Sequence, residues 1–234
     1  MAKAVGLSRN IKMQWLNKAV DLLDENLEEA EYKNTINEYL SFEIGSAINI
    51  RKTREILMHL WFYQNDETND VRKMGLSLIR AYPDYALPIH WCMMLITYPV
   101  FADVCKLIGR ISDFQEEITL AQLKQKLFDE WGERATLFHS TDKIIKTMKE
   151  LGALYCDKPG KYYIENHSVN NDQLLNFMLF VAMKVGGNSY YTFSDLANMG
   201  ILFPFEYQLR KEQLMTDERF VINNFGGEIT VAIK

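Results

Sequence analysis

Residues 116–164 constrain the fold more than any other part of the chain. Two amphipathic helical patterns follow one another there, the first ending at Trp131-Gly132 and the second at Leu151-Gly152. Two β-prone segments come next, joined by Lys158-Pro159-Gly160-Lys161, in which proline and then glycine suit a type II turn. Because helix, turn, helix and hairpin in this order are typical of a winged helix-turn-helix, we expect that fold in this stretch.

The ends of these two helices carry recognisable signals. Thr119 is followed three residues later by Gln122, a capping-box pattern that predicts the start of a helix over 120–131. Gly132 predicts its end, because glycine readily adopts the conformation that closes a helix. We expect Thr136 to cap the second helix.

The second helix supplies the candidate recognition face. Its apolar positions form one stripe, so the polar residues on the other side should face outward, toward the major groove if the partner is duplex DNA. A lysine on each side of the hairpin turn could lie along a phosphate backbone. The predicted DNA contacts in this unit are Arg134, Thr136, His139, Ser140, Lys143, Lys146, Thr147, Lys158 and Lys161.

A second basic cluster lies earlier in the chain. Arg51, Lys52 and Arg54 fall within one turn of a helix that Ser46 is placed to cap. They are the densest basic group in the sequence, and we treat them as a second candidate contact surface. The alternative is an ordinary solvated helix face.

The rest of the chain predicts a mainly α fold. Helical periodicity indicates two helices over 8–45, a third after Ser46 with Ile48 on its apolar side, and others over 71–82, 88–98, 100–114, 170–185 and 193–199. The tail changes to β-branched segments around Gly226-Gly227, which predicts a small C-terminal β element. We therefore expect a helical N-terminal region (1–97), a central winged helix-turn-helix (98–165) and a C-terminal region of helices and a β-hairpin (166–234).

Composition limits the function classes. The hydrophobic share of 48% supports a folded core, and the net charge of −5 means that any nucleic-acid affinity must come from a local patch. Three cysteines without paired spacing indicate reduced thiols. The most apolar stretch, 86–100, is too short to span a bilayer, and no signal-peptide pattern opens the chain. We expect a cytoplasmic protein.

Motifs for catalysis and metal binding are not found in the sequence. The nearest glycines lack the lysine and the setting of a phosphate-binding loop. The four histidines are isolated from one another and from the cysteines, so no metal-ligand spacing appears. Pro83-Asp84 is not followed by the acidic-x-Lys strand of a metal-dependent nuclease. We expect no enzyme activity, no cofactor and no metal.

Several motifs resemble a known family. They are Leu87-Pro88-Ile89-His90-Trp91, Thr97-Tyr98-Pro99-Val100-Phe101-Ala102-Asp103-Val104, Ile108-Gly109-Arg110 and Trp131-Gly132-Glu133-Arg134-Ala135-Thr136. With the size and plan of the chain, they are similar to the small winged-helix BrxA accessory proteins of bacterial BREX phage-defence systems. The likeness covers roughly residues 45–210 and differs in the aromatic, proline-containing central helix. It implies a non-enzymatic DNA-binding subunit of a multi-protein defence assembly, with no catalytic residues.

Two functions therefore follow from the sequence. The first is a non-catalytic protein that binds duplex DNA weakly, through phosphate contacts, and works with other proteins of the same system. The second is a scaffold or adaptor whose winged helix and acidic N-terminal helices bind a larger protein, without a membrane in either case. A continuous positive surface from Arg134 to Lys161 would favour DNA, and a broken one would favour protein.

Overall fold

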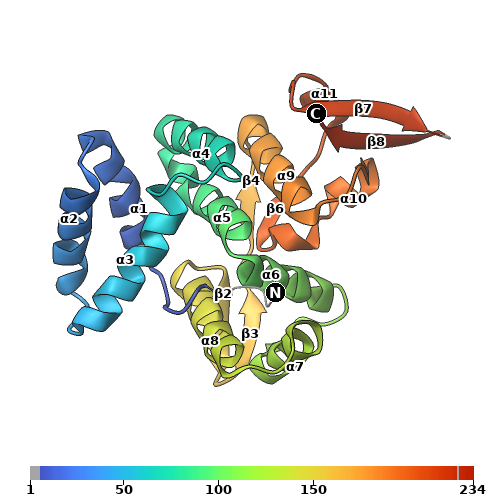
Figure 1. The fold of residues 1–234 in the computed structure, drawn as a ribbon. Helices are drawn as coiled ribbons and strands as arrows, with labels where there is room; N and C mark the ends of the chain where they lie inside the picture. The colour runs from blue at the N-terminus through green and yellow to red at the C-terminus, as the bar shows by residue number, and fades with distance from the viewer. Residues whose placement is uncertain (1–5, 226) are drawn as a thin grey trace.

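The computed structural model describes residues 6–225 and 227–234, and most of them are helical (Figure 1). The N-terminal helices are α1 (Met13–Asp21), the short 3-10 helix η1 (Leu22–Glu25), α2 (Glu29–Ser41) and α3 (Ala47–Trp61). They lie together at one end of the molecule. Tyr32 of α2 is fully buried and its hydroxyl donates to the carbonyl of Ala19 in α1 at 2.5 Å. Ile48 was expected on the apolar side of this helix, but it lies on the first turn of α3 and is 61% exposed.

The centre of the fold is made of long apolar helices. They are α4 (Asn69–Ala81), the 3-10 helix η2 (Pro83–Tyr85), α5 (Ala86–Thr97), α6 (Pro99–Ser112) and α9 (Asp172–Gly186). Helix α5 packs against α4, α6 and α9, and it is buried on nearly every side. It begins at Ala86 rather than at the predicted Pro88, because the first turn of a helix tolerates a proline that lacks an N–H.

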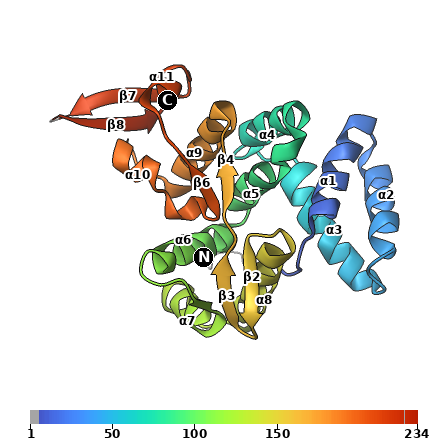
Figure 2. The ribbon, with the colours of Figure 1, turned by 180° about the vertical axis from the view of Figure 1, so that it is seen from behind.

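The next unit runs from α6 through β1 (Ile118–Thr119), α7 (Leu120–Trp131), α8 (Ala135–Glu150), β2 (Leu154–Lys158) and β3 (Lys161–Ile164). Its strands form an antiparallel sheet in the order β1-β3-β2, with Ile118 opposite Tyr162. Gly160 has φ of 83°, which suits the tight turn between β2 and β3. Figure 2 shows this sheet from behind, beside α7 and α8.

The C-terminal region contains two further sheets. Its elements are β4 (His167–Val169), β5 (Tyr191–Thr192), α10 (Phe193–Ala197), η3 (Gly200–Leu202), β6 (Phe205–Tyr207), α11 (Lys211–Met215), β7 (Phe220–Phe225) and β8 (Glu228–Ile233). Strands β4 and β6 pair in parallel, while β5, β8 and β7 form an antiparallel sheet in that order. The expected turn at Gly226-Gly227 is only partly visible, since Gly226 lies outside the described residues and Gly227 has φ of 88°.

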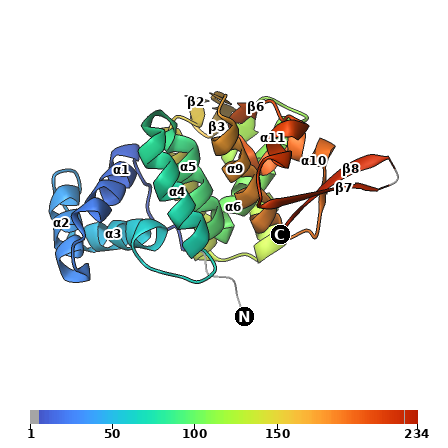
Figure 3. The same cartoon turned by 90° about the horizontal axis from the view of Figure 1, so that it is seen from above.

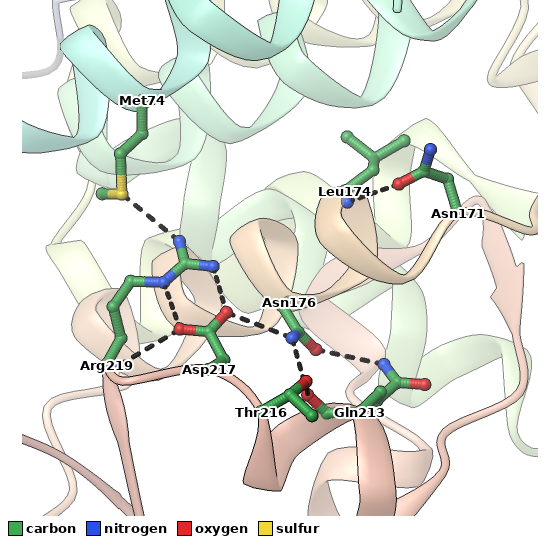
Figure 4. Close-up of polar contacts among 8 residues, drawn as sticks. All are labelled: Met74, Asn171, Leu174, Asn176, Gln213, Thr216, Asp217 and Arg219. Atoms are coloured by element: carbon green, nitrogen blue, oxygen red, sulfur yellow. Dashed lines mark hydrogen bonds and ion pairs between the residues drawn. The ribbon is translucent and has the colours of Figure 1, made fainter.

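A polar junction attaches the C-terminal hairpin β7–β8 to the helices (Figure 4). The buried amide of Asn176 in α9 donates to the carbonyl of Gln213 and to the carboxylate of Asp217, both at 3.1 Å. Asp217 pairs with Arg219, which also reaches the sulfur of Met74 in α4 at 3.2 Å. Burial raises the pKa of Asp217, but the hydrogen bonds and charge of Arg219 outweigh burial and lower it.

One hydrophobic core connects the three ranges expected from the sequence. Trp61, Trp91, Phe101 and Phe177 come from all three ranges and are fully buried in it. Figure 3 shows α5 beside α6 and α9, and α3 packs against α5 from the N-terminal end of the molecule. Among the described residues, no single helix is long and apolar enough to cross a bilayer. The stretches 83–97 and 99–112 meet that criterion only together, and they are bent by 115°.

Candidate nucleic-acid interface

The turn between α7 and α8 is fixed by packing on α6. The indole of Trp131 donates to the carboxylate of Asp103 in α6 at 3.0 Å, and Gly132, with φ of 76°, ends α7 as predicted. The guanidinium of Arg134 lies 5.8 Å from the centre of the Trp131 ring and donates to the Trp131 carbonyl at 3.4 Å. Arg134 therefore stays half-buried against the turn.

The start of α8 differs from the prediction. The helix begins at Ala135, and its N-cap is Arg134, which makes no side-chain capping bond. Thr136 lies one residue inside the helix, so the prediction that it caps α8 is wrong. Its side chain is nevertheless exposed, as a surface contact requires. At the start of α7, by contrast, the hydroxyl of Thr119 accepts from the Gln122 N–H at 3.2 Å, as the capping pattern predicted.

One stripe of α8 faces outward. Thr136, His139 and Lys146 are exposed, and Lys143 is half-buried between them. Their spacing of three and four residues places them along one side of the helix. Lys149 continues this stripe and is also exposed, although the sequence reasoning omitted it. Lys149 could have been predicted from the same helical spacing that identified Lys146, since it follows Lys146 by three residues.

Ser140 and Thr147 do not belong to this stripe, and their prediction as DNA contacts is wrong. Ser140 is 4% exposed and Thr147 is fully buried. The Thr147 hydroxyl accepts from the backbone N–H of Ile11 at 3.0 Å and donates to the Lys143 carbonyl at 2.9 Å. The segment before α1 therefore packs on this side of α8 and removes it from solvent.

The hairpin β2–β3 presents its two lysines unequally. Lys158 is exposed. Lys161 instead forms an ion pair with Glu117 beside β1, with Nζ 2.8 and 2.7 Å from the two carboxylate oxygens. The hydrogen bond from Lys161 lowers the pKa of Glu117, and the same bond raises the pKa of Lys161. A phosphate group would have to compete with Glu117 for this lysine, so Lys161 is the weaker candidate contact.

The outer face of the hairpin also carries an aromatic pair that the sequence reasoning missed. Tyr155 and Tyr163 lie directly opposite each other on β2 and β3, and their rings stack with centroids 5.2 Å apart. Tyr155 is 49% exposed. Strand alternation was the available signal, because Leu154 faces the core and Tyr155 must then face outward.

The positive surface expected from Arg134 to Lys161 is broken at both ends, because Arg134 lies against the Trp131 ring and Lys161 is paired with Glu117. The outer stripe of α8 is the part of it that supports a DNA contact. Lys124 of α7 pairs with Asp142 at 2.6 Å and sits 3.3 Å from the centre of the Phe138 ring, so this acidic side chain is neutralised locally. Among the described residues, none forms an ion pair with Lys143 or Lys146. Both ammonium groups therefore remain available to an anionic partner.

The three residues of the second basic cluster lie on α3 but differ in exposure. Arg51 and Lys52 are exposed, whereas Arg54 donates to its neighbour Glu55 in α3 at 3.1 and 2.6 Å and to Asn37 of α2 at 3.1 Å. The prediction that all three form one contact surface is therefore wrong for Arg54.

Arg51 and Lys52 line an open groove of about 1280 Å³ beside the N-terminal segment. Gly6 and Ser8 of that segment line the same groove. Arg9, one residue further on, donates to Asn49 of α3. The segment thus lies against both α3 and α8 and connects the two basic regions.

Some titratable groups elsewhere lie in the hydrophobic core. Burial lowers the pKa of His90 to about 3, and its Nε2 lies 2.9 Å from the side-chain oxygen of Asn17. Burial also raises the pKa values of the Cys92 and Cys105 thiols. Within the described ranges, no three or more His, Cys, Asp or Glu side chains are grouped to hold a metal ion.

Comparison with protein-family models, with curated proteins and with solved structures gave no match to this chain. We therefore infer function from the geometry of α8, its neighbouring turn and the hairpin β2–β3.

Proposed function

We propose that this chain is a non-catalytic DNA-binding protein in which residues 98–165 act as a winged helix-turn-helix. Support comes from the order α6-β1-α7-α8-β2-β3 and from the sheet order β1-β3-β2. In this assignment α8 is the recognition helix and the hairpin β2–β3 is the wing. Helix α8 then enters the major groove, and the wing lies along the adjacent backbone.

The observation that carries the proposal is the outer stripe of α8. It presents Thr136, His139, Lys143 and Lys146 on one side of a helix, and Lys158 is exposed on the neighbouring hairpin. Lysines contact phosphates regardless of sequence, while in this proposal His139 meets base edges. With few cations and a net charge of −5, the expected binding is weak, salt-sensitive and nearly independent of sequence.

We further propose that the protein acts as an accessory subunit of a bacterial phage-defence system, in the cytoplasm and together with other proteins of that system. The likeness of its motifs to the BrxA proteins supports this role. No catalytic step is assigned to the chain. Its contribution is to hold a DNA segment and a protein assembly together.

Fluorescence anisotropy with a labelled duplex at low salt tests the DNA interface. The variant Lys143→Ala with Lys146→Ala should bind at least about tenfold more weakly, because each phosphate contact contributes to affinity. The matched control is Lys73→Ala with Lys211→Ala, which removes the same charge from exposed positions on α4 and α11. Equal loss in both double variants would mean that net charge, and not α8, governs binding.

A second function, that of a protein adaptor, is favoured by two exposed apolar side chains outside the proposed DNA contacts. Phe42 and Ile48 flank the turn between α2 and α3 and are 81% and 61% exposed, next to the acidic Glu43. Exposed apolar side chains of this size often mark a protein contact. Phe42→Ser with Ile48→Ser should leave duplex binding intact. Loss of phage restriction in cells carrying this variant would favour the adaptor role.

A further inference from the structure

The outer edge of β7 is an unpaired strand edge within the described part of the chain. Strand β7 lies at one end of the sheet β5-β8-β7, and among the described residues no strand pairs with its other side. The hairpin β7–β8 projects from the helical body in two perpendicular views (Figures 1 and 3). Unpaired strand edges attract other strands, so natural proteins usually cover or block them.

The hydrogen-bond pattern identifies which backbone groups point outward. The Lys234 N–H donates to the Arg219 carbonyl at 3.0 Å, and these residues are opposite each other in the register that pairs Phe220 with Ile233. In an antiparallel ladder, alternate residues bond to the partner strand, so the N–H and C=O groups of Ile222 and Asn224 point away from β8. The outward N–H of Phe220 is already bound to the Asp217 carbonyl at 3.1 Å.

This edge lacks the features that normally block pairing. The segment Phe-Val-Ile-Asn-Asn-Phe contains no proline and no charged residue. Its register with β8 runs without a bulge, whereas β2 shifts register between Cys156 and Lys158. A regular, uncharged edge of this kind is ready to accept another strand.

We propose that β7 pairs antiparallel with β7 of a second copy of this chain, about a two-fold axis at Asn223. Ile222 of one copy then lies opposite Asn224 of the other, and each outward N–H and C=O of these two residues gains a partner. The two hairpins join into one continuous sheet. The half-buried Ile222 side chain, which lies on the same face as the buried Val231, becomes covered across the axis.

A second copy fits this edge better than an unrelated strand for two reasons. The outward residues are spaced symmetrically about Asn223, so the edge is complementary to itself. It also carries no charge, so pairing with an identical strand brings no like charges together. The junction of Asn176, Asp217 and Arg219 holds the base of the hairpin in place, and the edge is therefore preorganised.

Sedimentation velocity over a range of protein concentrations, without DNA, tests the dimer. Asn224→Pro removes one outward N–H and places a ring at the edge, and this N–H takes no part in the β7–β8 ladder. Asn224→Ala is the matched control, because it removes the same side chain and keeps the N–H. We expect the proline variant to dimerise at least about tenfold more weakly than the alanine variant.

Amide hydrogen exchange gives an independent readout in the same samples. The Ile222 and Asn224 amides of the parent protein should become protected as the dimer forms, while the Val221 and Asn223 amides stay protected throughout. A parent chain that is monomeric at roughly 100 µM overturns the proposal. A dimer formed equally well by both variants, with exchange at Ile222 and Asn224 unchanged, also overturns it.

Discussion

Replacing Thr147 by valine tests whether the segment before α1 is fastened to α8. The Thr147 hydroxyl is the acceptor for the buried N–H of Ile11, at 3.0 Å. Valine has the same shape but no acceptor, so this N–H would remain buried without a partner. An unsatisfied buried donor costs about 1–3 kcal/mol. The methyl group recovers part of this through apolar burial, at about 0.8 kcal/mol.

Thr141→Val is the matched control on the same helix. Thr141 is also fully buried, and its hydroxyl donates to the Leu137 carbonyl at 2.8 Å, as that of Thr147 does to Lys143 at 2.9 Å. It differs in having no bond to a distant backbone N–H among the described residues. We therefore expect Thr141→Val to change the free energy of unfolding by less than about 0.5 kcal/mol.

Urea denaturation of the two variants provides the measurement. Thr147→Val should lose about 1–2 kcal/mol relative to Thr141→Val, which corresponds to a difference in Tm of about 2–8 °C for a chain of this size. The Ile11 amide should also exchange faster in Thr147→Val alone. Equal stability of the two variants, with an unchanged Ile11 amide, would refute the proposed attachment of the N-terminal segment.

Other predictions concern close packing at two helical glycines and the ion pair at the base of the C-terminal hairpin. Gly109→Ala should destabilise the protein by about 1–3 kcal/mol in a denaturation experiment. The added Cβ would lie 2.2 Å from the carbonyl oxygen of Gly200, and relieving this clash requires the backbone to move. Gly75→Ala, at a buried position of α4 where the nearest atoms would lie at 3.4 Å, should be neutral or stabilising by up to about 1 kcal/mol. A larger loss there than at Gly109 would contradict the packing. Asp217→Asn should destabilise the protein at neutral pH. The lowered pKa of Asp217 stabilises the fold above the unfolded value of about 4, and this contribution is lost as pH falls through the folded pKa. Denaturation midpoints measured from neutral to acidic pH should therefore converge for the parent and Asp217→Asn, and a constant gap would argue against the ion pair with Arg219.

Local signals predicted much of the fold. The capping threonine Thr119 and the closing glycine Gly132 correctly marked both ends of α7. The helix predicted over 100–114 is found as α6, which begins one residue earlier, at Pro99. The tail hairpin was anticipated from β-branched residues around a glycine turn, and β7 and β8 are found there. These successes share a cause, since each signal acts within a few residues of the structure it sets.

Long-range contacts account for the features that the sequence did not reveal. The parallel pairing of β4 with β6 and the joining of β5 to β8 bring together segments far apart in the chain. The same holds for the candidate site. Thr147 is polar and was assigned to the outer face, but the segment near Ile11 covers it. Lys161 was expected to be free, but β1 places Glu117 beside it.

The salt dependence of duplex binding tests the central claim most directly. For about three to five phosphate contacts, a plot of log affinity against log salt should have a slope of about −3 to −5. Lys143→Ala with Lys146→Ala should reduce the magnitude of the slope by about 2, and Lys73→Ala with Lys211→Ala should leave it unchanged. Absence of binding at roughly 50 µM protein and low salt, or a slope that the α8 variant does not change, would contradict DNA recognition through this helix.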